Sequence, residues 1–75
     1  MLAYLLITVG SGREKDIAET LKNYNEIKQV HILFGEWDII ALVEVDSPEH
    51  LGTFVMEKIR TLPGVKLTST MIVAQ

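Results

Sequence analysis

Apolar residues recur at every second position along four short stretches of the chain. In Leu2–Val9 and Ile39–Val45 both alternating faces are largely apolar, which is typical of strands that are covered on both sides. Ile27–Phe34 and Val65–Ala74 alternate in the same way, with more polar residues on one face. The sequence therefore predicts four strands, and a sheet whose two faces are both partly apolar.

A first helix is predicted between the first two strands, from about Arg13 to Tyr24. Apolar residues fall on one stripe of this stretch and charged residues on the rest. The helix follows a glycine-containing loop in which Ser11 stands three residues before Glu14, the spacing of a capping box. We expect an ordinary strand-to-helix turn here, because no phosphate-binding glycine fingerprint or Walker lysine follows.

A second helix is predicted after Asp46. Ser47 is the expected N-cap residue and Pro48 the first helical residue, because proline is favoured at that position. Pro63 and Gly64 end the helix. Its apolar stripe comprises Leu51, Phe54, Val55, Ile59 and Leu62.

The order strand, helix, strand, strand, helix, strand predicts a ferredoxin-like α+β fold in one domain, residues 1–75. Its four-stranded antiparallel sheet carries both helices on one face, so apolar side chains of the opposite face lack a cover. We expect a second copy of the chain to pack there, giving a dimeric α/β barrel. The side chains in question are Tyr4, Leu6, Leu33, Leu42 and either Met71 or Ile72.

A glycine-containing turn, Phe34–Asp38, connects the second and third strands. We expect a tight hairpin connection in which Gly35 adopts a positive φ. Glu36, Trp37 and Asp38 then lie together on the rim of the sheet. A large amphipathic ring beside two carboxylates is a candidate binding site.

Composition narrows the functional classes. The chain has 75 residues, of which 48% are apolar, and no cysteine, so neither disulfides nor thiolate metal sites support the small core. The net charge of −3 and the scattered basic residues argue against direct binding of nucleic acid. No stretch is long enough to span a membrane and no signal peptide is apparent, so we expect a cytoplasmic protein.

The sequence contains few candidate catalytic residues. His31 and His50 lie on different predicted elements, without an acid at a metal-ligand spacing, and we expect His50 to be solvated. We expect His31, on a strand face beside Leu33, to be a satisfied interface residue. The sheet lacks the aromatic residues with which related folds stack RNA bases. We therefore expect a recognition module rather than an enzyme, with no metal or cofactor.

Two motifs carry a family resemblance that extends over essentially the whole chain. Val30–Asp38, followed by an apolar strand, resembles the effector-binding half of the Lrp/AsnC transcription regulators. Ile59–Val65, with its Pro-Gly-Val ending, and the following Thr68–Val73 resemble the second half of that domain. Those regulators also carry an N-terminal helix-turn-helix, which this sequence lacks, so it resembles the stand-alone form of the domain, also called the RAM module.

The resemblance implies dimers that face each other through their sheets and assemble into rings, often octameric or decameric. It also implies that small amino acids bind where dimers meet. Gly35, Trp37 and Asp38 match the family's loop, and Thr68 and Thr70 match its polar pair on the last strand. Full-length Lrp/AsnC regulators are implied as further partners.

The chemistry of an amino acid suits these positions. Asp38 would bind the ammonium group, and the amides of the Gly35 loop with the hydroxyls of the last strand would bind the carboxylate. An apolar wall would contact the ligand side chain, and Glu36 would favour basic or polar ligands or disfavour ligands altogether. The predicted site comprises His31, Leu33, Gly35, Glu36, Trp37, Asp38, Thr68, Ser69 and Thr70.

Three readings remain at this point, and amino-acid binding is the first. Gly35, Trp37 and Asp38 also fit a turn and an assembly contact without any ligand. The chain would then be an oligomerisation partner of full-length Lrp/AsnC regulators. A small dimeric ferredoxin-like enzyme is the third reading, for which the sequence shows no catalytic cluster.

Overall fold

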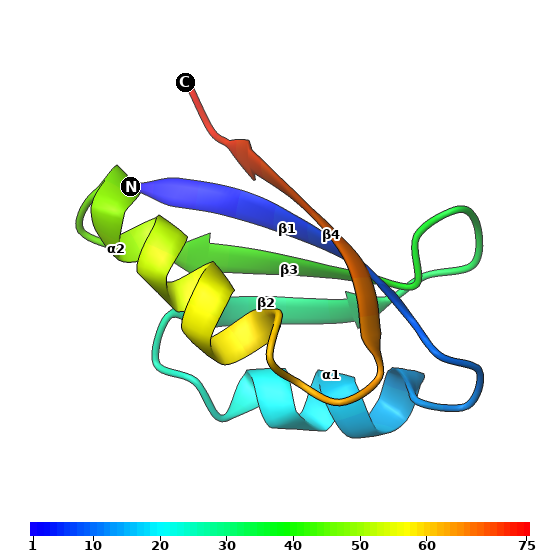
Figure 1. The fold of residues 1–75 in the computed structure, drawn as a ribbon. Helices are drawn as coiled ribbons and strands as arrows, with labels where there is room; N and C mark the ends of the chain where they lie inside the picture. Colours follow the sequence, from blue (N-terminus) through cyan, green and yellow to red (C-terminus); the bar gives the residue numbers. More distant parts are fainter.

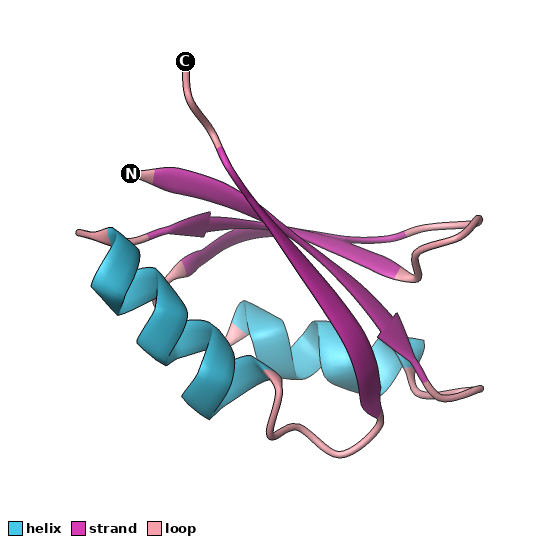
Figure 2. Ribbon diagram, turned by 45° about the horizontal axis from the view of Figure 1, so that its top comes forward, coloured by secondary structure: helices cyan, strands magenta, loops and turns pink.

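The computed structural model describes all residues 1–75 and has the predicted ferredoxin-like fold. The sheet order is β2-β3-β1-β4, and every neighbouring pair is antiparallel. Both helices lie against the same face of the sheet (Figures 1 and 2). No helix is long and apolar enough to cross a membrane. The elements are β1 (Leu2–Val9), α1 (Glu14–Lys22), β2 (Ile27–Ile32), β3 (Ile39–Glu44), α2 (Pro48–Phe54), the π-helical segment η1 (Val55–Ile59) and β4 (Val65–Ile72).

The core lies between the sheet and the two helices and contains no polar residue. The two central strands supply it by strict alternation: Leu5 and Ile7 of β1 and Ile39 of β3 are fully buried. The helices contribute their predicted apolar stripes. The helical members of the core are Ile17, Ala18, Leu21, Leu51, Phe54, Val55 and Ile59.

The opposite face of the sheet has no cover within the chain and is apolar, as predicted. Tyr4, in the central strand β1, keeps 40% of its surface exposed, and Met71, its partner on β4, keeps 48%. Ile72 instead pairs with the buried Ala3, so Met71 and not Ile72 belongs to the uncovered face. We call this surface the open face; its residues include Leu2, Tyr4, Leu6, Ile40, Leu42, Leu67, Ser69 and Met71.

The start of α1 differs from the prediction. The N-cap residue is Arg13, which makes no side-chain capping bond, and the predicted capping box at Ser11 is wrong. The Glu14 carboxylate accepts instead from the Gly12 amide, at 3.2 Å, so it closes the preceding loop rather than the helix end. The start of α2 is as predicted, because the Ser47 hydroxyl accepts from the His50 amide at 3.0 Å.

The second helix does not continue regularly to its predicted end. After Phe54 it widens into the π-helical η1, which ends where the Arg60 amide donates to the Val55 carbonyl at 2.9 Å. The chain then turns at Gly64, whose backbone angle φ of +97° is one that residues other than glycine rarely adopt. The Gly64 carbonyl accepts from the Gly10 amide at 2.8 Å, which fastens this turn to the end of β1.

The connection between β2 and β3 is longer than the predicted tight hairpin. β2 ends at Ile32, and residues 33–38 form a loop that the Leu33 amide closes by donating to the Asp38 carbonyl at 2.8 Å. Gly35 has a positive φ of +149°, as predicted. Phe34 is not part of a strand; its side chain is fully exposed on this loop.

Candidate functional site

Asp38 fastens loop 33–38 to the end of the central strand. Its Oδ2 accepts from the Val9 amide at 2.8 Å, and its own amide donates to the Ile7 carbonyl at 3.0 Å. These bonds hold the carboxylate at the end of the sheet, half-buried, in a defined orientation. The second oxygen, Oδ1, has no hydrogen-bond or ion-pair partner in the chain and remains able to accept from a ligand.

The other loop residues surround this carboxylate with different exposure. Trp37 is half-buried, whereas Gly35 and Glu36 are exposed, which agrees with the predicted place of Trp37 on the rim. Phe34 is the residue that sequence reasoning missed at this site. The alternation of Ile27–Phe34 included Phe34 in the predicted strand, and the glycine that follows it was the one signal that the strand ends earlier.

The polar residues of β4 lie on two different faces. Thr68 and Thr70 pair with the buried Ile7 and Leu5, so they share the helix-covered side of the sheet. Ser69 points to the open face. The predicted hydroxyl groups therefore do not converge on a single point within one chain.

His31 belongs to the open face, because it pairs with Ile40 across the β2–β3 ladder. Leu33 follows β2 and is half-buried. Ile39, the neighbour of Asp38, and Thr68 both pair with Ile7 from opposite sides, so they are about 10 Å apart at two strand spacings. No hollow of the chain is lined by both Asp38 and a hydroxyl of β4.

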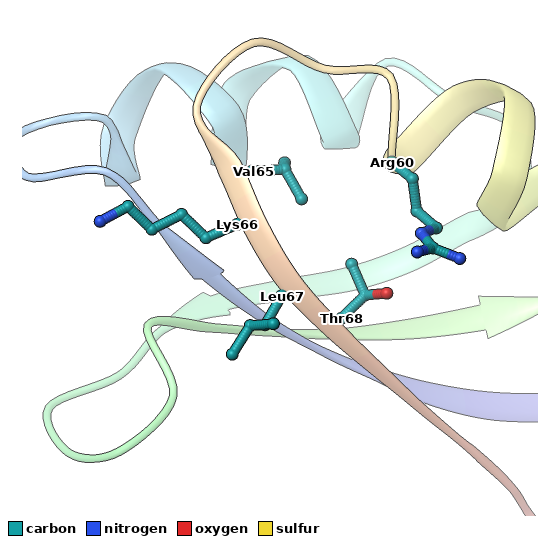
Figure 3. A pocket seen from close by; sticks show the side chains of 5 residues that line it. All are labelled: Arg60, Val65, Lys66, Leu67 and Thr68. Carbon is teal, nitrogen blue, oxygen red and sulfur yellow. The ribbon is translucent and has the colours of Figure 1, made fainter.

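Two hollows mark the surface of the chain, and neither includes loop 33–38. The larger, of about 270 Å³, lies beside the outer edge of β4 and is lined by Arg60, Val65, Lys66, Leu67 and Thr68 (Figure 3). The smaller, of about 230 Å³, is lined by residues of β2 and by Lys22 at the end of α1. Of the predicted site residues, Thr68 alone lines a hollow.

The second histidine has partners that the sequence did not suggest. His50, expected to be solvated, is half-buried, with Nε2 3.3 Å from a carboxylate oxygen of Glu26. Its Nδ1 accepts from the Asp46 amide at 3.3 Å. These contacts fasten the start of α2 to the start of β2. No group of three or more histidine, aspartate or glutamate side chains is placed to hold a metal ion.

Fold and site together define a small α+β binding domain in which the predicted site residues share no hollow within one chain. Comparison with known proteins gives its family. The model of the Lrp/AsnC ligand binding domain matches residues 2–75, so the chain belongs to the Lrp/AsnC family, as the motifs predicted. It is a ligand-binding domain related to transcription regulators.

Individual relatives agree with this assignment. The HTH-type transcriptional regulator FL11 of Pyrococcus abyssi is 37% identical over 73 residues, which are 97% of this chain and 48% of that protein. The chain thus spans about half the length of the first curated relatives it matches. The crystal structure of FFRP-DM1 is 38% identical, with a TM-score of 0.93 over 96% of each chain.

A more distant structure shares the fold. It is the complex of the transcriptional regulator NMB0573 from Neisseria meningitidis with L-Met, 17% identical, with a TM-score of 0.91. The superposition covers 99% of this chain and 49% of that one. At this identity the likeness establishes the architecture alone.

Proposed function

We propose that the chain is an amino-acid-binding effector module that assembles into dimers and higher rings and modulates transcription regulators. The observation that carries this proposal is the state of Asp38: one carboxylate oxygen is held by the Val9 amide, and the other has no partner. A carboxylate oriented in this way is a suitable acceptor for an ammonium group. The L-Met complex of a protein with the same fold supports the choice of ligand class.

The rest of the site would come from neighbouring copies. The open face is apolar and uncovered, which favours a homodimer formed by two facing sheets. The half-buried Trp37 and the fully exposed Phe34 lie on loop 33–38 at the sheet end, where contacts between dimers would build a ring, octameric or decameric. Such a ring would bring the Asp38 loop of one copy near the β4 hydroxyls of another.

Calorimetric titration with the full set of protein amino acids tests the ligand. A free amino acid has few heavy atoms, so we expect dissociation constants of about 10 µM to 1 mM. Absence of heat with every amino acid at several millimolar would refute the binding function. The carboxylate of Glu36, exposed on the same loop, favours basic or polar ligands among those tested.

The second candidate function is that of an oligomerisation partner for full-length Lrp/AsnC regulators, without a ligand of its own. The open face favours this candidate as much as it favours a homodimer, because a regulator's own domain would present the same surface. Co-purification with such a regulator, unchanged by any amino acid, would support this candidate over the first.

A further inference from the structure

We propose that the hollow beside the outer edge of β4 is a binding site for the carboxylate of a small organic acid, recognised by Arg60 and Thr68. The hollow of about 270 Å³ has two cationic residues and a hydroxyl in its lining and no acidic residue. It has room for several water molecules at roughly 30 Å³ each, and hence for a carboxylate with a short apolar body.

The guanidinium group and the hydroxyl converge. Figure 3 shows Arg60 and Thr68 on the same side of β4, with the threonine oxygen turned toward the guanidinium group. Neither side chain has a hydrogen-bond or ion-pair partner in the chain, although Thr68 is half-buried. A guanidinium group binds a planar carboxylate through two parallel hydrogen bonds, and the hydroxyl can donate a third.

The edge of β4 supplies a main-chain donor at the same place. The Leu2 carbonyl accepts from the Val73 amide at 2.9 Å, so these two residues form a hydrogen-bonded pair of the β1–β4 ladder. Hydrogen-bonded and non-hydrogen-bonded pairs alternate along an antiparallel ladder. By the register, Ile7–Thr68 is a non-hydrogen-bonded pair, so the main-chain groups of the two residues point away from each other. The amide of Thr68 therefore points outward from the free edge, beside its own hydroxyl.

A rare backbone feature places the arginine. Arg60 follows the π-helical η1, and its amide makes the bond to Val55 that closes the wide turn. Each π turn holds more residues than an α turn, so η1 changes the direction in which Arg60 leaves the helix. Segments of this kind are uncommon and are frequent at functional sites.

The charge of the hollow matches one carboxylate better than a phosphate. Arg60 is the single cation that faces Thr68, because Lys66 extends the other way (Figure 3). One guanidinium group balances one negative charge, whereas a phosphate group carries about −1.5 to −2 near neutral pH. Val65 and Leu67 add apolar surface for the body of an organic acid.

Lys66 also provides a matched control. Lys66→Gln and Arg60→Gln remove the same charge from the same hollow, but only the second removes a side chain that faces Thr68. Arg60→Lys keeps the charge and removes the planar fork. Arg60→Lys also keeps a cation at the C-terminal end of the helix, where it interacts favourably with the helix dipole. Weaker binding in this variant would therefore reflect the loss of the planar guanidinium group.

The test is a titration of the full chain with sodium acetate at constant ionic strength, monitored through the amide signals in NMR spectra. Parallel titrations use sodium chloride and sodium phosphate. We expect the Thr68 amide to shift to saturation with acetate, with a dissociation constant of about 1–30 mM. Arg60→Gln weakens acetate binding about tenfold or more, as loss of a charged hydrogen-bonding partner does, and Lys66→Gln changes it less than about threefold. Arg60→Lys falls between the two.

Three results would overturn the proposal: equal weakening by Arg60→Gln and Lys66→Gln, the same shifts with chloride as with acetate, or tighter binding of phosphate than of acetate. The inference shares Thr68 with the proposed amino-acid site, but it does not require Asp38 or an amino-acid ligand, so the two can fail separately. Acetate that binds at Arg60 while every amino acid fails in calorimetry would retain the hollow and refute the amino-acid module. Amino acids that bind without any change in the Arg60→Gln variant, with acetate inactive, would do the reverse.

Discussion

At the scale of single residues, Asp38 combines a structural contact with the proposed binding contact. The two can be separated, because they use different oxygen atoms of one carboxylate. An asparagine at this position retains an oxygen for the Val9 amide and replaces the free oxygen by the NH2 group of an amide, which donates and does not accept. An alanine removes both. The pair of substitutions therefore tests stability and ligand binding independently.

We expect the free energy of unfolding of Asp38→Asn, measured in urea, to lie within about 1 kcal/mol of that of the unsubstituted chain, since a neutral hydrogen bond replaces a charged one. Amino-acid binding in the same variant should weaken about tenfold to a hundredfold, because the charged acceptor of the ammonium is lost. Calorimetry measures the second quantity. Unchanged affinity in this variant would remove Asp38 from the proposed site.

Asp38→Ala should lower the free energy of unfolding by about 1–3 kcal/mol, because the amide of the buried Val9 is left without an acceptor. Urea denaturation at fixed protein concentration measures this loss. A stability equal to that of Asp38→Asn would mean that the bond to Val9 contributes nothing to the folded state.

At the scale of elements, the turn between η1 and β4 depends on a glycine. A Cβ on Gly64 would lie 3.3 Å from side-chain atoms of Arg13 and Ile17, and φ is +97° there. Gly64→Ala should therefore destabilise the fold by about 1–3 kcal/mol. Gly52, inside α2, has ordinary φ and nothing within 4 Å of such a Cβ. Gly52→Ala should stabilise by about 0.5–1 kcal/mol, since alanine is the better helix former.

Thermal or urea unfolding of these two glycine variants gives opposite signs if the backbone conformation is as described. A Gly64→Ala variant that is as stable as the unsubstituted chain, or more stable, would show that the turn at Gly64 tolerates a side chain, and a destabilised Gly52→Ala variant would contradict the prediction for α2. Because Gly64 also accepts from Gly10, the effect should reach the end of β1. Amide exchange near Gly10 should accelerate in Gly64→Ala and remain unchanged in Gly52→Ala.

The same elements show what sequence reasoning can and cannot reach. Alternation predicted all four strands, because side chains on a pleated strand change face at every residue. In β1 and β3 both alternating sets are apolar, so the pattern alone did not assign the buried face. The pattern could not show where β2 ends, since Phe34 continues it while the chain has already left the sheet. The π-helical η1 was equally invisible, because an apolar stripe does not report a change in helical hydrogen bonding.

The candidate site was predictable in its residue types and not in its geometry. The loop with Gly35 and Asp38 was recognised by its motif. The bond between Asp38 and Val9, 29 positions apart, depends on the sheet order, which places β1 beside β3. The register of β4 then separates Thr68 from Ser69, and no pattern in a single strand reveals which of the two faces the helices.

At the scale of the whole molecule, loop 33–38 is predicted to join dimers into rings. Trp37→Ala should reduce the assembly to dimers or smaller rings and leave the fold intact, because Trp37 is half-buried at the rim and is not part of the core cluster. Sedimentation velocity with circular dichroism measures both. Loss of the folded spectrum would place Trp37 in the core instead.

The open face leads to the last prediction. Tyr4 lies on the central strand of this face, where two facing sheets would bury it, so Tyr4→Lys should weaken the dimer about tenfold to a hundredfold. Met56 is the matched control: it is an apolar residue, 64% exposed, on η1, which packs on the other side of the sheet, and Met56→Lys should leave the dimer unchanged. Sedimentation equilibrium across micromolar concentrations measures both constants. Because no hollow of one chain contains both a β4 hydroxyl and the Asp38 carboxylate, a protein that is already a monomer at these concentrations would lack the proposed amino-acid site.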